Sequence, residues 1–104
     1  MDYKRVLKIF LEYKDAQRAQ QMKRYMRNQF DFIGVSSPLR LQITKQILKS
    51  LNKDSFIDWG FIKSCWNASY REMKYFVISY LLHLKQNLNR ESLNQIEYLL
   101  LTDS

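Results

Sequence analysis

Glycine and proline are nearly absent from this chain, and their scarcity restricts the folds that it can adopt. Only two glycines and one proline occur among its 104 residues, whereas β folds use such residues at many of their tight turns. Leu, Lys, Gln and Arg, which favour helices, are frequent instead. Hydrophobic residues make up 46% of the chain, enough for one small core. We therefore predict a single all-α domain over residues 1–104.

Apolar residues at helical spacing divide the chain into six predicted helices. Their approximate ranges are 2–14, 16–29, 37–51, 55–66, 69–88 and 89 to the end. The third helix has a start signal in Ser37, an N-cap residue before Pro38. The fourth and fifth helices each begin with a capping box, Ser55 with Asp58 and Ser69 with Glu72. The predicted helices are joined by connections of only a few residues, so successive helices should pack antiparallel. A row of such helix pairs predicts an α-solenoid of HEAT-like repeats.

Positive charge is concentrated in the N-terminal half of the chain. Residues 1–53 contain 12 Lys and Arg against 4 Asp and Glu, giving +8, whereas residues 54–104 contain 5 against 6, giving −1. Cations gathered on one face favour a polyanionic partner, because binding releases counterions from phosphates. The alternative is that the lysines only keep the helices soluble.

Residues 24–40 carry the strongest functional signal, because rings and arginines lie close together there. These side chains are Arg24, Tyr25, Arg27, Phe30, Phe32 and Arg40. Rings stack on bases and guanidinium groups bind phosphates, so the mixture suits a nucleic-acid surface. The candidate contacts with a nucleic-acid backbone are Arg24, Arg27, Arg40 and Ser37, and for the arginines the alternative is solvated surface or pairing with Asp31. Gly34, in the loop 30–36, is expected to take a positive φ.

Other residues with chemical potential are explained by packing. His83 lies between leucines, which is typical of a core-edge or surface histidine. Cys65 has no disulfide partner in the chain and is typical of a small buried hydrophobe. Trp59 and Trp66 share one helix face, where core packing is the expected role and base stacking the alternative. The sequence contains no Cys/His cluster for a metal and no glycine-rich phosphate loop.

The beginning of the chain is amphipathic and does not read as a secretory leader. The apolar runs are much shorter than the roughly 18 residues of a membrane span. Together with the single cysteine, these features predict a cytoplasmic protein.

One segment resembles the signature of a known family. The run Tyr25-Met26-Arg27-Asn28-Gln29-Phe30-Asp31-Phe32-Ile33-Gly34-Val35, followed by Pro38 and Arg40, is similar to the start of the AlkD-like DNA alkylation repair enzymes, which are DNA glycosylases built from HEAT-like repeats. Weaker matches follow in the same order, at Trp59 and Trp66 and in the run Arg71-Glu72-Met73-Lys74-Tyr75. The resemblance covers most of this chain and only the N-terminal portion of whole family members.

The resemblance implies excision of cationic alkylated purines, such as 3-methyladenine and 7-methylguanine, from double-stranded DNA at the nucleoid, without metal or cofactor. Tyr25 matches the family's N-terminal pocket aromatic, and such rings stabilise an oxocarbenium-like transition state. The alternative is that Tyr25 fills the interface between the second and third helices. The family's catalytic aspartate lies in a Trp-Asp segment, which does not surround Asp103. We therefore assign no catalytic residue and expect these 104 residues to be inactive alone.

Two further classes of function stay open. In the first alternative, the chain is a non-enzymatic, basic DNA-binding helical module. In the second, it is a helical-repeat scaffold that binds protein and uses its charge only for solubility. A solenoid cut between repeats exposes the apolar face of its last helix. That face contains Leu93, Ile96, Tyr98 and Leu99 to Leu101, so we expect self-association through this end.

Overall fold

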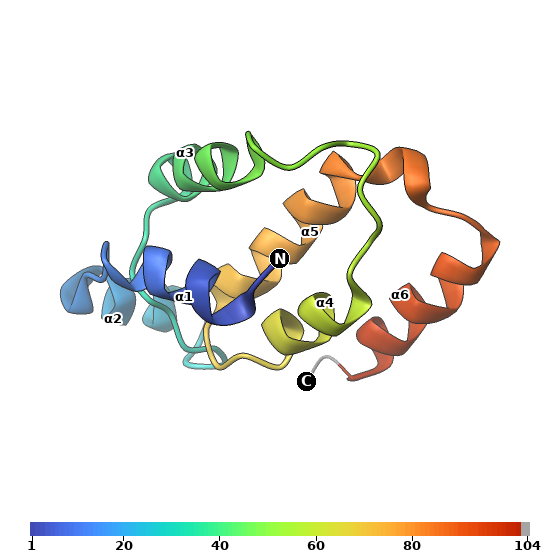
Figure 1. The fold of residues 1–104 in the computed structure, drawn as a ribbon. Helices are drawn as coiled ribbons and strands as arrows, with labels where there is room; N and C mark the ends of the chain where they lie inside the picture. The colour runs from blue at the N-terminus through green and yellow to red at the C-terminus, as the bar shows by residue number, and fades with distance from the viewer. Residues whose placement is uncertain (103–104) are drawn as a thin grey trace.

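The computed structural model describes residues 1–102, and its regular structure is helical (Figure 1). The six α-helices are α1 (Tyr3–Leu11), α2 (Ala16–Tyr25), α3 (Ser37–Leu48), α4 (Trp59–Trp66), α5 (Arg71–His83) and α6 (Arg90–Thr102). A short 3₁₀ helix, η1 (Lys85–Asn87), joins α5 to α6. No strand occurs within residues 1–102, and the predicted all-α class with six helices is confirmed.

Helix α2 ends at Tyr25, before the expected end at Gln29. Arg27 and Asn28 adopt left-handed backbone conformations, with φ values of 58° and 59°. The Asn28 N–H donates to the Lys23 carbonyl oxygen at 2.8 Å, which is the hydrogen bond that closes a helix of the Schellman type. Asparagine tolerates the left-handed region better than most residues do, so Asn28 is the stop signal that the sequence prediction overlooked.

The predicted starts of α3 and α4 were wrong. Ser36, not Ser37, is the N-cap of α3, and its side chain makes no capping hydrogen bond. Asp58, not Ser55, caps α4, because its carboxylate accepts the Phe61 N–H at 3.0 Å. Both segments contain two residues capable of capping, and local sequence alone does not choose between them.

The prediction for α5 was wrong at both ends. Tyr70, not Ser69, precedes the helix, and the Glu72 side chain takes no part in a capping box. The helix ends at His83 rather than at Leu88 because η1 interrupts it. Helix α3 likewise ends before Leu51, so the helices are in general shorter than expected.

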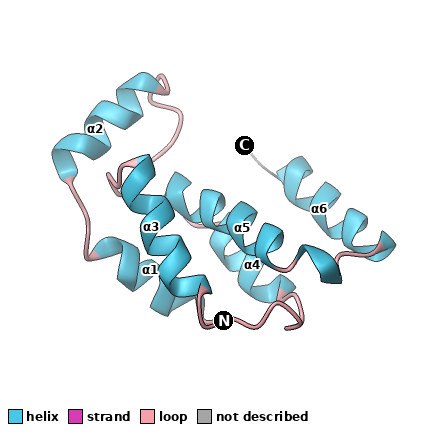
Figure 2. Ribbon diagram, turned by 90° about the horizontal axis from the view of Figure 1, so that it is seen from above, coloured by secondary structure: helices cyan, strands magenta, loops and turns pink. Residues whose placement is uncertain are grey.

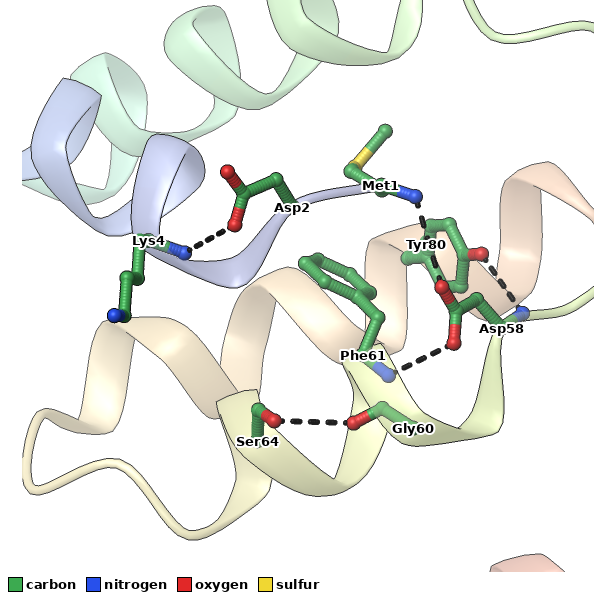
Figure 3. A network of polar contacts seen from close by, with 8 residues as sticks. All are labelled: Met1, Asp2, Lys4, Asp58, Gly60, Phe61, Ser64 and Tyr80. Atoms are coloured by element: carbon green, nitrogen blue, oxygen red, sulfur yellow. Dashed lines mark hydrogen bonds and ion pairs between the residues drawn. The ribbon is translucent and has the colours of Figure 1, made fainter.

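Asp58 joins three parts of the chain (Figure 3). Besides capping α4, its carboxylate lies 3.7 Å from the Met1 amine. Its backbone N–H donates to the Tyr80 hydroxyl oxygen of α5 at 3.1 Å. Burial raises the pKa of Tyr80 above its usual value, although the hydrogen bond from Asp58 acts in the opposite direction. The Tyr80 hydroxyl therefore stays protonated at neutral pH and fixes the start of α4 to α5.

Aromatic rings from three helices form the centre of the core. Phe76 of α5 meets Phe10 of α1 and Phe61 of α4 edge to face, with centroid distances of 5.9 and 6.0 Å. Tyr80 contacts Phe61 in the same way at 5.1 Å. Such pairs add directional attraction to the burial of apolar area. The core accordingly centres on α5, which packs against both α3 and α4.

The remaining helices lie at opposite edges of the molecule (Figure 2). Helix α2 has no buried residue, whereas α6 packs on α4, and the Trp66 indole N–H donates to the Leu99 carbonyl oxygen at 2.8 Å. Leu99 is buried and Ile96 is half-buried, so the expected apolar face of α6 is only partly exposed.

The order of the helices along the chain is compatible with a solenoid. Within residues 1–102, no helix is long and apolar enough to cross a bilayer.

Candidate nucleic-acid interface

A buried carboxylate fixes the loop that follows α2. Glu72, in the first turn of α5, has no exposed surface. Its Oε1 accepts the Ile33 N–H at 2.9 Å, and its Oε2 accepts the N–H groups of Gly34 and Val35 at 2.9 and 3.2 Å. Hydrogen bonds to an ionised acceptor are stronger than those between neutral groups. One side chain of α5 therefore orders three consecutive loop residues.

Gly34 allows this loop to pass close to the start of α2. Its φ is +98°, and a Cβ at this position would overlap the Asp15 carbonyl oxygen. On one side the Asp15 N–H donates to the Ile33 carbonyl oxygen at 3.1 Å, and on the other the Arg71 N–H donates to the Asp31 carbonyl oxygen at 2.8 Å. The expected positive φ is confirmed, and the loop is attached to both α2 and α5.

The end of α2 presents three of the predicted contact residues to solvent. Tyr25 is 87% exposed, so it does not fill the interface between α2 and α3. Arg24 and Arg27 are also exposed. Asp31 pairs with Lys23 at 3.0 Å, and neither arginine has an acidic partner within residues 1–102. Their charge is therefore available to an external anion.

Tyr25 lies at a groove of about 470 Å³ between α2 and the start of α3. The groove is lined by Arg18, Gln21, Met22, Tyr25, Met26, Phe32, Ser36, Ser37, Pro38 and Tyr75. Rings and methionine side chains give it a polarizable apolar surface. None of these lining residues is acidic, so the groove by itself offers no carboxylate for chemistry.

The start of α3 borders the same groove. Ser37 is exposed there, and Arg40 is half-buried one turn further along the helix. Because the Ser36 side chain makes no capping hydrogen bond, the positive end of the helix dipole is not offset by an N-cap side chain. This end of the groove is therefore positively polarised, in addition to the charge of Arg40.

Two arginines and two rings form a stack beside the groove, which we call the arginine–aromatic stack. The Arg71 guanidinium carbon lies 4.2 Å from the centroid of the Phe30 ring and 5.6 Å from that of Tyr75. The Arg40 guanidinium carbon lies over the same Tyr75 ring at 4.7 Å. The stack thus brings together α3, α5 and the loop 30–36, while Arg24 and Arg27 lie outside it.

Tyr75 and Arg71 were not predicted as site residues. The available signal was their spacing, because residues i and i+4 share one face of a helix. Their approach to Arg40 and Phe30 depends on tertiary packing, which no local pattern of the sequence describes. The resulting surface combines guanidinium groups, rings and a basic helix, a combination suited to phosphates and sugars.

A family model described as DNA alkylation repair enzyme matches residues 6–103. The chain belongs to the DNA alkylation repair enzyme family. The resemblance to the AlkD-like members seen in the sequence is thereby confirmed. A comparison with curated proteins finds no match. Membership in a DNA repair family suggests DNA as the polyanionic partner for the excess of cations in the N-terminal half.

The other chemically notable side chains of this family member have packing roles. Trp66 is buried and Trp59 is half-buried against the core. Nε2 of His83 lies 2.7 Å from the Leu51 carbonyl oxygen and links the ends of α5 and α3. Cys65 is fully buried, and burial raises its pKa to about 12. The thiol is therefore neutral and enclosed.

Proposed function

We propose that residues 1–102 form one wall of a DNA glycosylase that excises cationic alkylated purines, of the 3-methyladenine and 7-methylguanine type, from duplex DNA. The observation that carries the proposal is the placement of Tyr25 in a groove bordered by Arg18, Ser37 and the start of α3. In this arrangement Tyr25 faces the lesion, and the cations around it bind the phosphate backbone. With DNA as the substrate, the protein acts in the cytoplasm at the nucleoid.

The proposed chemistry follows from the charge that develops during cleavage of the N-glycosidic bond. The sugar acquires oxocarbenium character, and the electron-rich face of Tyr25 attracts that positive charge. The groove contains no acidic residue, so the carboxylate that such a reaction requires is not supplied from its lining. We therefore expect the 104-residue chain to bind duplex DNA without releasing 7-methylguanine.

The binding half of the proposal is tested by the salt dependence of duplex affinity. Arg27→Ala and Arg40→Ala should each reduce the slope of log K against log salt by about one unit, because each removes one phosphate contact. Arg90→Ala, which removes an exposed cation from α6, is the matched control and should leave the slope unchanged. Equal slopes for all three variants would contradict the assignment of Arg27 and Arg40 to the backbone.

The chemical half requires the catalytic aspartate to be supplied together with this wall. In such a protein, Tyr25→Ala should lower the single-turnover rate of 7-methylguanine excision, while Tyr25→Phe, which keeps the ring, should retain most of it. Tyr13→Ala, at another exposed tyrosine, controls for the loss of a surface ring. Unchanged single-turnover rates for Tyr25→Ala would remove Tyr25 from the lesion site.

A second candidate, a DNA-binding module without chemistry, is favoured by the same lack of acidic residues in the groove. The two candidates differ in one outcome. Release of 7-methylguanine by the protein that includes the catalytic aspartate supports the glycosylase, whereas tight duplex binding with no release supports the module. A chain that binds no DNA at low salt would contradict both candidates and leave a protein-binding scaffold.

A further inference from the structure

We propose that Tyr75 is a positioning residue that holds Arg40 ready for a DNA phosphate. This inference rests on the proposed function, because it takes duplex DNA as the ligand. The Arg40 guanidinium carbon lies 4.7 Å from the centroid of the Tyr75 ring. A guanidinium group held over a ring keeps its N–H donors at the edge, where a phosphate oxygen can accept from them.

The charge of Arg40 is not neutralised by neighbouring acids. Within residues 1–102 its side chain makes no ion pair. The elements that carry the arginine–aromatic stack contain two acidic residues, Asp31 in the loop and Glu72 in α5. Asp31 binds Lys23 at 3.0 Å, and Glu72 accepts three backbone N–H groups. Both acids are thus occupied, and the stack presents positive charge.

The ring is itself held in place. Tyr75 is half-buried on α5, between Glu72, which fastens the helix to the loop, and Phe76, which lies in the core. An arginine that moves freely in solvent loses rotamer freedom when it binds a phosphate, and a preformed contact with a fixed ring reduces that loss. Tyr75 therefore contributes to DNA affinity through Arg40, without a contact of its own with the phosphate.

The test is a double-mutant cycle on duplex binding by the 104-residue chain. Tyr75→Leu should weaken binding about two- to five-fold, the range expected for loss of an exposed cation–π contact. Its salt slope should stay unchanged, because Arg40 keeps its charge and still reaches the phosphate. Tyr75→Phe keeps the ring and should bind as the unaltered chain does. In the Arg40→Ala background, Tyr75→Leu should have no further effect.

Each alternative outcome has a distinct meaning. Equal weakening by Tyr75→Leu with and without Arg40, or an unaltered affinity of Tyr75→Leu, would overturn the positioning role while leaving DNA binding intact. Failure of the unaltered chain to bind duplex DNA would instead contradict the proposed function. Thermal melting of each variant checks the fold, and Tyr75→Met, which also lacks a ring, replaces Tyr75→Leu in the cycle if the leucine variant does not fold.

Discussion

Glu72 and Gly34 together hold the loop between α2 and α3. Gly34 has a φ of +98°, which lets the loop pass close to the Asp15 carbonyl oxygen. The Glu72 carboxylate accepts three backbone N–H groups that lie 37 to 39 residues earlier in the chain. The path of the loop therefore depends on a side chain that only the folded chain brings to it.

The hydrogen bonds of Glu72 make a direct stability prediction. Glu72→Gln should lower the free energy of unfolding by about 1–3 kcal/mol, because one acceptor oxygen replaces two and buried N–H groups lose their partner. Urea denaturation measures the change. Glu97→Gln, at an exposed site on α6, is the matched control and should stay within about 0.5 kcal/mol of the unaltered chain. A Glu72→Gln midpoint equal to that of the control would mean that the carboxylate contributes little.

Cys65 predicts a pH dependence of stability. Burial raises the pKa of its thiol from 9.0 to about 12 in the folded state, so the unfolded chain ionises first as the pH rises. The contribution of the neutral Cys65 thiol to the free energy of unfolding is complete below pH 9. This contribution is lost progressively between pH 9 and 12, by up to about 1.4 kcal/mol per pH unit. Urea denaturation from pH 8 to 11 should show the difference between the unaltered chain and Cys65→Ala shrinking above pH 9. A constant difference would show that the thiol titrates alike in both states.

At the scale of elements, helices were predictable and their ends were not. Apolar periodicity identifies α1, α3, α4 and α5, because each of them buries residues in the core, whereas α2 has no buried residue. The ends depend on which residue caps. Asn28 closes α2 through a left-handed conformation, and Asp58 starts α4 in part because Tyr80 and the Met1 amine meet it there. Those partners come from other elements, so the choice over Ser55 is made by tertiary contacts.

The cap of α4 is testable by substitution. Asp58→Ala should lower the free energy of unfolding by about 0.5–2 kcal/mol, the usual range for loss of an N-cap side chain. Asp54→Ala, at an exposed acid in the preceding loop, controls for the change in charge. Thermal melting compares the two variants. A larger loss for Ser55→Ala than for Asp58→Ala would restore Ser55 as the start of the helix.

At the scale of the whole molecule, the two edges differ in chemistry. The α2 edge is polar and basic, while α6 carries apolar side chains in solvent, with Leu93 and Leu100 each 64% exposed, Tyr98 55% and Leu101 80%. Several exposed apolar side chains on one helix favour association. We therefore expect reversible self-association through α6.

Sedimentation velocity over a range of concentrations measures that association. The double variant Leu100→Lys/Leu101→Lys should remain monomeric at concentrations where the unaltered chain associates, because charge replaces the apolar contact. The control is Leu82→Lys, because Leu82 lies on α5 and is as exposed as Leu100. This variant should associate as the unaltered chain does. A monomeric unaltered chain at high concentration would exclude the proposal.

The candidate site was predictable in its composition and less so in its geometry. The basic half and the segment 24–40 follow from residue types and their order, whereas the role of Tyr25 came from the family resemblance and its exposure from the structure. The approach of Arg40 and Arg71 to Tyr75 required knowledge of how α3 packs against α5. Periodicity predicts which face of a helix is buried, but it does not specify which side chains of two helices meet.

The loop held by Glu72 also affects where a phosphate can bind. Consecutive backbone N–H groups that converge on one point form an anion-binding nest, and residues 33–35 form such a nest around a carboxylate of the protein itself. An anion near this loop therefore meets donors whose hydrogen bonds are already made. The nest is shut to external anions, so the phosphate contacts that we propose are restricted to the arginines and the start of α3.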